Sequence, residues 1–247
     1  MGFALVAFFP GLALGSFLNV VAARVPLRRS IVRPASACMA CKVPIAPRDN
    51  IPLFSYLRLG GRCRVCAVRI PFRYPAVELA TGLLLAGCAV RFGVTWDTLV
   101  AAFICAVLVA ISATDLEHRI VPNRIVVPAA AVVLAAQTAL HPSPEWAIGA
   151  LGASAFLLLA ALAYPAGMGM GDVKLALLMG AALGRVVPVA LMVGMVSALV
   201  PSAVLFARHG AGARKMGIPL APFLALGTIV ALFAGHELLR AYLSLMH

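Results

Sequence analysis

The chain has 247 residues, of which 63% are hydrophobic and only 11% are charged. Its mean hydropathy of +1.04 excludes an ordinary water-soluble domain and indicates that lipid is its solvent. The formal net charge of +12 would suit a nucleic-acid-binding protein. The distribution of this charge along the chain indicates a membrane surface instead.

Apolar segments that cross the hydrocarbon core of a bilayer need about 20 residues each. The sequence predicts about eight, with seven as the alternative count. They run approximately over residues 3–22, 76–92, 97–114, 121–140, 146–165, 172–184, 186–207 and 219–243. The sixth is short enough to be a broken helix that its neighbours shelter. No Lys or Arg precedes the first, so we expect a retained span and not a secretory signal. The predicted fold is an all-α polytopic membrane protein.

Positive charge is concentrated between the first two predicted spans. Of the 20 Lys and Arg residues, 11 lie from Arg24 to Arg73. The positive-inside rule makes this stretch cytoplasmic, and counting spans outward from it leaves the opposite face almost free of cations. We expect the basic face to lie against anionic lipid headgroups, at about 1 kcal/mol per nearby Lys or Arg. No nucleic-acid partner is expected.

Four of the six cysteines lie in this basic stretch in the pattern CxxC–x21–CxxC. They are Cys38, Cys41, Cys63 and Cys66. Each CxxC pair places two thiolates on one tight turn, and two such turns can close a tetrahedral zinc site. Redox pairs or a disulfide cluster are the alternatives, which a reducing cytoplasm disfavours. Zinc held by four cysteines has no open position, so its predicted role is to fold a loop rich in Pro and Gly.

Two aspartates lie at the predicted cytoplasmic ends of spans: Asp115 ends the third, and Asp172 begins the sixth. Ionisable groups at this depth are costly and by default functional, although each could instead cap its helix or pair with Arg119 or Lys174. If the two helices pack together, the carboxyl groups meet and share a proton. One can then activate a water while the other protonates a departing amide. The pair predicts peptide hydrolysis without a nucleophilic side chain.

Several neighbours support this prediction. Gly169 and Gly171 leave almost no side-chain bulk before Asp172, so the backbone there can bend or admit an extended peptide. Pro122 fixes the entry into the fourth span. Lys174 could stabilise a carboxylate or extend to the headgroups.

Several motifs along the chain have the order found in one known family. They are Gly15-Ser-Phe-Leu-Asn-Val20, Asn50-Ile-Pro52, Gly61-Arg-Cys-Arg-Val-Cys66, Tyr74-Pro-Ala-Val-Glu-Leu79, Asp115-Leu-Glu-His-Arg-Ile-Val-Pro122, Gly169-Met-Gly-Asp-Val-Lys174 and Ile218-Pro-Leu-Ala-Pro-Phe-Leu-Ala-Leu-Gly227. With them the sequence resembles the type IV prepilin peptidases, membrane aspartic proteases with a GxGD signature. One small departure is Cys38-Met-Ala-Cys41, where a proline often follows the first cysteine.

The resemblance implies that Asp115 and Asp172 are the catalytic pair. It implies a substrate that is a prepilin of a type IV pilus or a pseudopilin of type II secretion, and removal of a short basic leader at the cytoplasmic face of a bacterial inner membrane. It also implies methyl transfer from S-adenosylmethionine to the new N-terminus. For this second activity Glu78 has two readings: a structural partner of the loop's arginines, or a group that holds the substrate's cationic amine.

The organisation expected on this basis has three parts. A first transmembrane helix covers 1–23, a cytoplasmic four-cysteine zinc-binding loop domain covers 24–75, and a transmembrane aspartic peptidase core covers 76–247. A transporter that carries ions on the same carboxylates is an alternative, but the acids gather at one edge and no repeated half is apparent. A catalytically inactive scaffold is a third reading, against which the presence of both aspartates argues.

Overall fold

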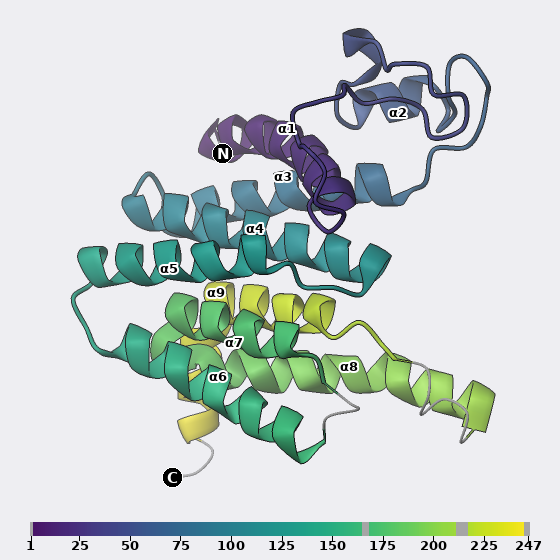
Figure 1. Cartoon of the computed structure of the whole chain (residues 1–247). Helices are drawn as coiled ribbons and strands as arrows, with labels where there is room; N and C mark the ends of the chain where they lie inside the picture. Colours follow the sequence, from purple (N-terminus) through teal and green to yellow (C-terminus); the bar gives the residue numbers. More distant parts are fainter. Residues whose placement is uncertain (1, 165–167, 211–216, 245–247) are drawn as a thin grey trace. The chain divides into compact units, whose positions relative to one another are not determined.

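The computed structural model describes residues 2–164, 168–210 and 217–244 (Figure 1). All regular elements within these ranges are helices, which confirms the predicted all-α fold. In chain order they are α1 (Gly2–Arg24), the 3-10 helix η1 (Pro47–Asp49), α2 (Phe54–Arg58), α3 (Arg73–Phe92), α4 (Trp96–His118), α5 (Asn123–Leu140), α6 (Glu145–Ala163), α7 (Met170–Leu183), the 3-10 helix η2 (Gly184–Val186), α8 (Val187–His209) and α9 (Ala221–Ser244).

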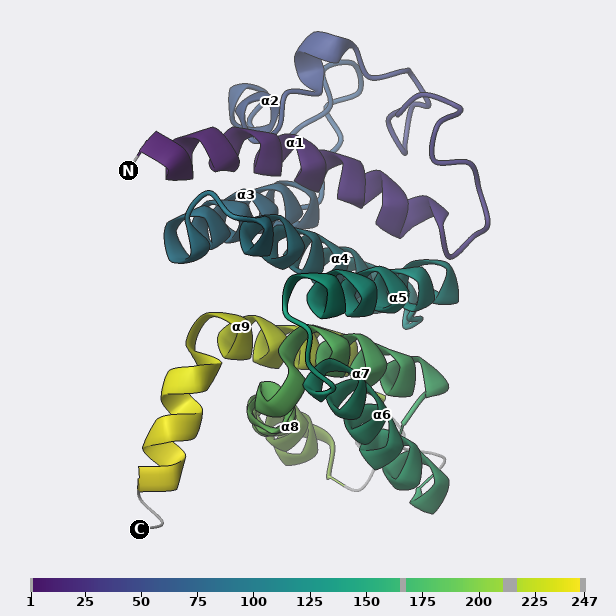
Figure 2. The same ribbon diagram turned by 90° about the vertical axis from the view of Figure 1, so that its left-hand side faces the viewer.

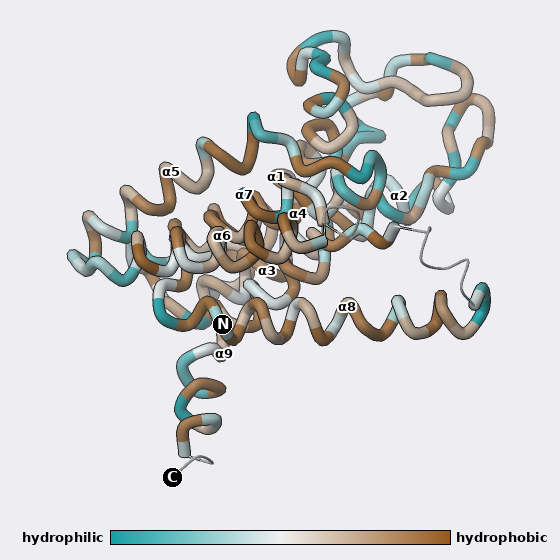
Figure 3. Tube along the Cα trace, turned by 60° about the horizontal axis from the view of Figure 1, so that its bottom comes forward, coloured by the Kyte–Doolittle hydropathy of each residue, from teal (hydrophilic) through white to brown (hydrophobic). Residues whose placement is uncertain are grey.

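Seven stretches of the described chain are long and apolar enough to cross a membrane. One of them, Met170–His209, contains two helices, α7 and α8, joined by η2. With 14 residues, α7 is only about 21 Å long, less than the roughly 30 Å hydrocarbon core. Figure 3 shows hydrophobic residues along most of the helices and hydrophilic ones gathered in the segment that carries α2.

The chain divides into two compact units, Met1–Ala113 and Thr114–His247. In the first, α1 packs along α3. A Cβ added at Gly11 would lie 2.8 Å from the Cα of Gly82, and one added at Gly15 would lie 2.6 Å from the Cα of Glu78. The glycines therefore allow the two backbones to approach closely, as is common between helices in membranes.

In the second unit, α7 packs against both α5 and α6, and α8 packs against α9. Most residues of α7 from Val173 onward are buried, as expected for a helix that is apolar on all sides. Its contact with α6 is close, because a Cβ at Gly149 would lie 2.9 Å from the carbonyl oxygen of Gly180. The buried amide of Gln137 on α5 donates to the Ala182 carbonyl at 3.1 Å. These contacts fix the position of α7, and with it the first turn that carries Asp172.

Candidate active site and metal site

Asp115 lies in the last turn of α4 and is buried, with 6% of its surface exposed. The helix ends just beyond it, because Arg119 adopts a left-handed φ of 54° and donates its N–H to the Asp115 carbonyl at 2.8 Å. The carboxylate Oδ2 accepts the N–H of Ala221, the first residue of α9, at 3.2 Å. The Arg119 charge also acts on this carboxyl group. A buried carboxyl is thereby paired with a donor at a helix N-terminus.

Asp172 lies in the first turn of α7, after Gly169 in the N-cap position. It is half-buried, and its N–H donates to the Gly169 carbonyl at 3.1 Å. The charge of Asp115 acts on the Asp172 carboxyl, so the two groups lie within electrostatic reach of each other. The C-terminal end of α4 and the N-terminal ends of α7 and α9 therefore meet around two carboxyl groups.

The two glycines before Asp172 have different surroundings. A Cβ at Gly171 would lie 2.8 Å from the Cβ of Val121, in the connection that follows α4. A Cβ at Gly169 would meet nothing closer than the Asp172 Oδ2, at 3.8 Å, and Gly169 is exposed. Gly171 thus allows α7 to approach the segment after Asp115, whereas Gly169 leaves an accessible stretch of backbone beside Asp172.

Pro122 and Lys174 lie at the same edge of the unit as the two carboxyl groups. Pro122 is buried, and its carbonyl accepts the N–H groups of Ile125 and Val126 at 3.0 and 3.1 Å, which starts α5. Lys174 Nζ donates to the Asn123 side-chain oxygen at 2.8 Å. The lysine therefore links the N-terminal part of α7 to the first residue of α5, a contact that neither sequence-based alternative for Lys174 anticipated.

Two groups at this edge were not predicted. The first is the N–H of Ala221, for which the only signal is the proline-bounded stretch Ile218-Pro-Leu-Ala-Pro222. The second is His118, one turn after Asp115, whose buried Nε2 has no hydrogen-bond partner among the described residues. Its spacing of three residues from Asp115 places both on neighbouring positions of one helix surface.

The four predicted cysteines come together. Their Sγ atoms all lie within 4.8 Å of one another, and those of Cys38 and Cys66 are 3.7 Å apart. A tetrahedral zinc ion with Zn–S bonds of about 2.3 Å places its sulfurs about 3.8 Å apart. The donor set and its dimensions therefore fit a four-thiolate metal site.

The two CxxC turns repeat one conformation. The fourth residue after each first cysteine, Lys42 or Ala67, has a left-handed φ of 61° or 55°. It donates its N–H to the carbonyl of Cys38 or Cys63, at 2.9 or 3.0 Å. The sequence signal is the pattern CxxCxVxI, present at 38–45 and again at 63–70. Two copies of one turn thus present their thiols to a common centre.

Backbone N–H groups favour the thiolate form in both turns. Those of Cys41 and Ala40 lower the pKa of the Cys38 thiol to about 6. The N–H groups of Cys66 and Val65 likewise lower the pKa of Cys63. Because the thiolate is the form that binds metal, these N–H groups favour the metal-binding form of Cys38 and Cys63, whereas desolvation and the neighbouring thiols raise the pKa of Cys41 to about 11.

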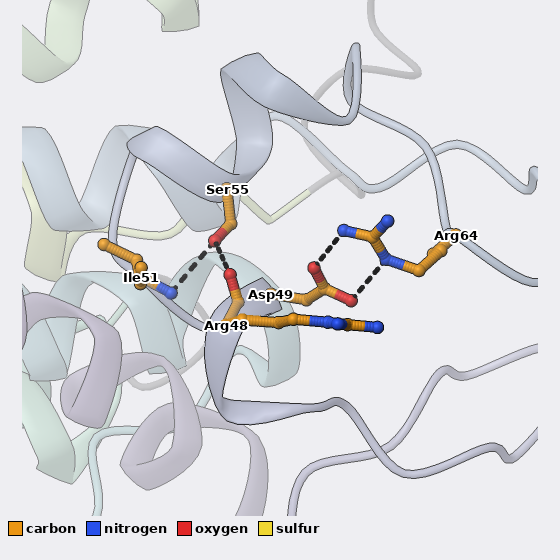
Figure 4. A network of polar contacts seen from close by, with 5 residues as sticks. All are labelled: Arg48, Asp49, Ile51, Ser55 and Arg64. Carbon is orange, nitrogen blue, oxygen red and sulfur yellow. Dashed lines mark hydrogen bonds and ion pairs between the residues drawn. The ribbon is translucent and has the colours of Figure 1, made fainter.

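The segment around η1 is tied to the second CxxC turn (Figure 4). The Arg64 guanidinium makes a bidentate ion pair with Asp49: its Nε lies 2.7 Å from Oδ2 and its Nη2 lies 2.5 Å from Oδ1. This ion pair holds the pKa of the Asp49 carboxyl below its usual range. The Ser55 hydroxyl accepts the N–H of Ile51 at 3.0 Å and donates to the Arg48 carbonyl at 3.2 Å. These bonds hold η1 and the start of α2 against the metal site.

Glu78 anchors this segment to α3. It is buried, and its Oε2 accepts the N–H of Leu53 at 2.8 Å. Leu53 has a φ of 58°, an unusual value for a residue with a side chain. The Ser16 hydroxyl of α1 also interacts with this carboxylate. The partners of Glu78 are thus a backbone N–H and a hydroxyl, where the sequence suggested the loop's arginines.

Comparison with known proteins covers nearly the whole chain. Residues 9–92 match the family model for the Bacterial Peptidase A24 N-terminal domain, and residues 102–234 match that of the Type IV leader peptidase family. Three curated relatives, each named prepilin leader peptidase/N-methyltransferase, come from Bacillus subtilis (strain 168), Myxococcus xanthus (strain DK1622) and Pseudomonas aeruginosa. The chain is 35% identical to the first over 97% of its own length and 98% of that protein. It is 40% identical to the second, over 86% and 66%, and 34% identical to the third, over 98% and 94%. No solved structure matches the chain.

Proposed function

The chain belongs to the type IV leader peptidase family, and we propose that Asp115 and Asp172 carry out its peptidase chemistry. It is a multi-pass membrane enzyme that cleaves the leader from prepilins and N-methylates the new terminus. What supports the catalytic pair is that both carboxyls lie at one edge of the second unit, where the charge of Asp115 acts on Asp172.

Two carboxyls whose negative charges repel each other cannot both ionise cheaply, so they share one proton. The ionised carboxylate takes a proton from a water, whose oxygen attacks the scissile carbonyl. The protonated carboxyl then donates to the departing amide nitrogen as the C–N bond breaks. The N–H of Ala221, 3.2 Å from the Asp115 Oδ2, supports an ionised Asp115.

The substrate reaches this pair along the exposed backbone at Gly169. An extended peptide can approach there closely, because no side chain intervenes. By the positive-inside rule this edge is cytoplasmic, the side on which a basic leader lies while the prepilin's apolar helix remains in the bilayer. Pseudopilins of type II secretion have the same chemistry and are included in the proposed substrates. Anionic headgroups are the proposed surroundings of the basic face.

Zinc is the proposed occupant of the four-cysteine site, where Cys38, Cys41, Cys63 and Cys66 would hold it in a closed, structural position. S-adenosylmethionine is the proposed methyl donor and would supply the methyl group for the new N-terminal amine. We retain the three-part organisation, with the zinc loop over 24–75, as a prediction.

Cleavage of a synthetic prepilin N-terminal segment by the purified enzyme, followed by mass spectrometry, tests the pair. Asp115→Asn and Asp172→Asn should each lower the rate by a factor of about 10²–10⁴ or more, because each removes a proton-transfer group. Glu117→Gln, at a neighbouring carboxylate of the same edge, is the matched control and should cleave normally. Wild-type rates in either folded aspartate variant would contradict the proposal.

A further inference from the structure

A concave site lies in the Thr114–His247 unit, at the end opposite the aspartates. It is a cavity of about 550 Å³ lined by Arg185, His236, Leu239, Arg240 and Leu243. Arg185 belongs to η2, which follows the far end of α7, and the other lining residues belong to the far end of α9. Both helices begin beside the carboxyl pair, so their full lengths separate this cavity from it.

The last turns of α9 differ from the rest of the helix. Figure 2 shows that α9 changes direction sharply before its C-terminal end. Gly235 is its last buried residue, and a Cβ there would lie 2.6 Å from the Cγ1 of Val186. Beyond it, Leu238, Tyr242 and Leu243 are 41–51% exposed. A short stretch of exposed apolar residues interspersed with polar ones, at the end of a membrane-crossing helix, suits the interface between headgroups and acyl chains.

The polar groups of the cavity suit a phosphate. Two arginines line it, and the planar N–H fork of a guanidinium matches phosphate oxygens. The Arg185 side chain is 70% exposed, with its Nε 3.7 Å from the Glu145 Oε2. The Nε of Arg240 donates to the His236 carbonyl at 3.3 Å, which uses one of the five N–H donors of that guanidinium.

The net charge here is nearly balanced, because Glu145 and Glu237 lie beside the cations. Attraction of anions by the field of the whole protein is therefore small at this end, in contrast with the basic loop of the first unit. Recognition must come from directed N–H donors. Leu239 and Leu243 form an apolar wall of the cavity. The glycerol and upper acyl chains of a lipid would pack against this wall, whereas a small inorganic anion would not.

We propose that this cavity binds the phosphodiester of a glycerophospholipid headgroup, held by Arg185 and Arg240. The acyl chains lie along the leucine wall, and the lipid braces the bent end of α9 against η2. The site is independent of the peptidase chemistry.

Native mass spectrometry of the detergent-purified enzyme, titrated with phosphatidylglycerol, tests the site. The double variant Arg185→Gln/Arg240→Gln should bind the lipid about thirtyfold more weakly, from the loss of two cation contacts. Arg208→Gln, which removes an arginine from the last turn of α8, is the matched control and should bind as wild type. Glu145→Gln frees Arg185 from its carboxylate and should bind more tightly. Cleavage of a prepilin segment reports whether each variant is folded.

Equal lipid binding by the double variant and wild type would overturn the proposal, as would an equal loss in Arg208→Gln. The Glu145→Gln variant keeps the test decisive if the double variant does not fold, because weaker or unchanged binding there contradicts the role of Arg185. A competition with inorganic phosphate separates the two sources of this chemistry. Displacement of the lipid by an equal concentration of phosphate would assign the cavity to a free anion and overturn the lipid site.

Discussion

Replacing Gly171 with alanine should move the carboxyl pair apart. The new Cβ would lie 2.8 Å from the Cβ of Val121 and 3.2 Å from its Cγ2, whereas carbon atoms in contact lie about 3.5–4.0 Å apart. The first turn of α7 and the connection after α4 must therefore separate by about 1 Å. Overpacking of this kind costs about 1–3 kcal/mol, and a 1 Å displacement of reacting groups can lower a rate about 100-fold. We expect a modest fall in the unfolding temperature and a large fall in prepilin cleavage.

Gly169→Ala is the matched control for this prediction. Gly169 has an extended backbone, with φ −85° and ψ 149°, which alanine adopts without strain. The unfolding temperature of the Gly169→Ala variant should therefore equal that of the wild type. The double variant Gly171→Ala/Val121→Gly removes the opposing Cβ and should recover part of the lost cleavage. Wild-type cleavage and stability in Gly171→Ala would refute the close-contact reasoning, and so would equal losses of stability at both glycines.

Three further outcomes concern the first unit. The purified enzyme should contain one zinc ion by metal analysis. The Cys38→Ser variant should lose the ion, and its loop should become accessible to trypsin in limited proteolysis. A loop that contains no zinc but is still protected from trypsin would contradict this. Glu78→Gln keeps an oxygen acceptor for the Leu53 N–H and should leave the loop protected, whereas Glu78→Ala should expose it, at a cost of about 1–3 kcal/mol for the unpaired donor. If Glu78→Gln instead loses only methylation, the charge acts on the substrate amine. Arg64→Gln should raise the pKa of Asp49 toward its ordinary value of about 4, because the guanidinium that favours the carboxylate is removed; an unchanged carbon-13 NMR titration would refute the ion pair.

Although the short η1 and α2 were not predicted, the membrane-spanning helices and their approximate ends were predictable because hydropathy and charge are properties of consecutive residues. The same holds for the cysteine cluster, where the CxxC spacing itself indicates a tetrahedral site. The predicted sixth and seventh spans correspond to α7 and α8. The sixth was predicted to be short and sheltered by its neighbours, and α7 is short and mostly buried; the signal was the length of the apolar segment and not its composition. Burial on all sides and membrane exposure both require apolar residues, so composition does not separate them.

The contacts around the carboxyl pair were not predictable, because they join residues far apart in the chain. The N–H of Ala221 and the carboxylate of Asp115 are 106 positions apart. A backbone N–H donor cannot be recognised from the residue type, because every residue except proline has one. Gly171 was interpreted as a source of flexibility or substrate access, whereas its neighbour Val121 shows that it permits close packing. Glu78 was placed correctly near the loop, but its partner is a backbone N–H at Leu53.

The arrangement of helix ends explains how two carboxyls can persist at a membrane edge. α7 begins at Met170 and α9 at Ala221, so two helix N-termini, each with a partial positive charge, face the same pair. They can compensate for the burial of one negative charge, and Arg119 adds to this at Asp115. A second negative charge would meet the repulsion of the first at short range in a medium of low polarity. The fold therefore favours the state with one shared proton, which is the state that the proposed mechanism requires, with one carboxyl as the base for water and the other as the acid for the departing amide.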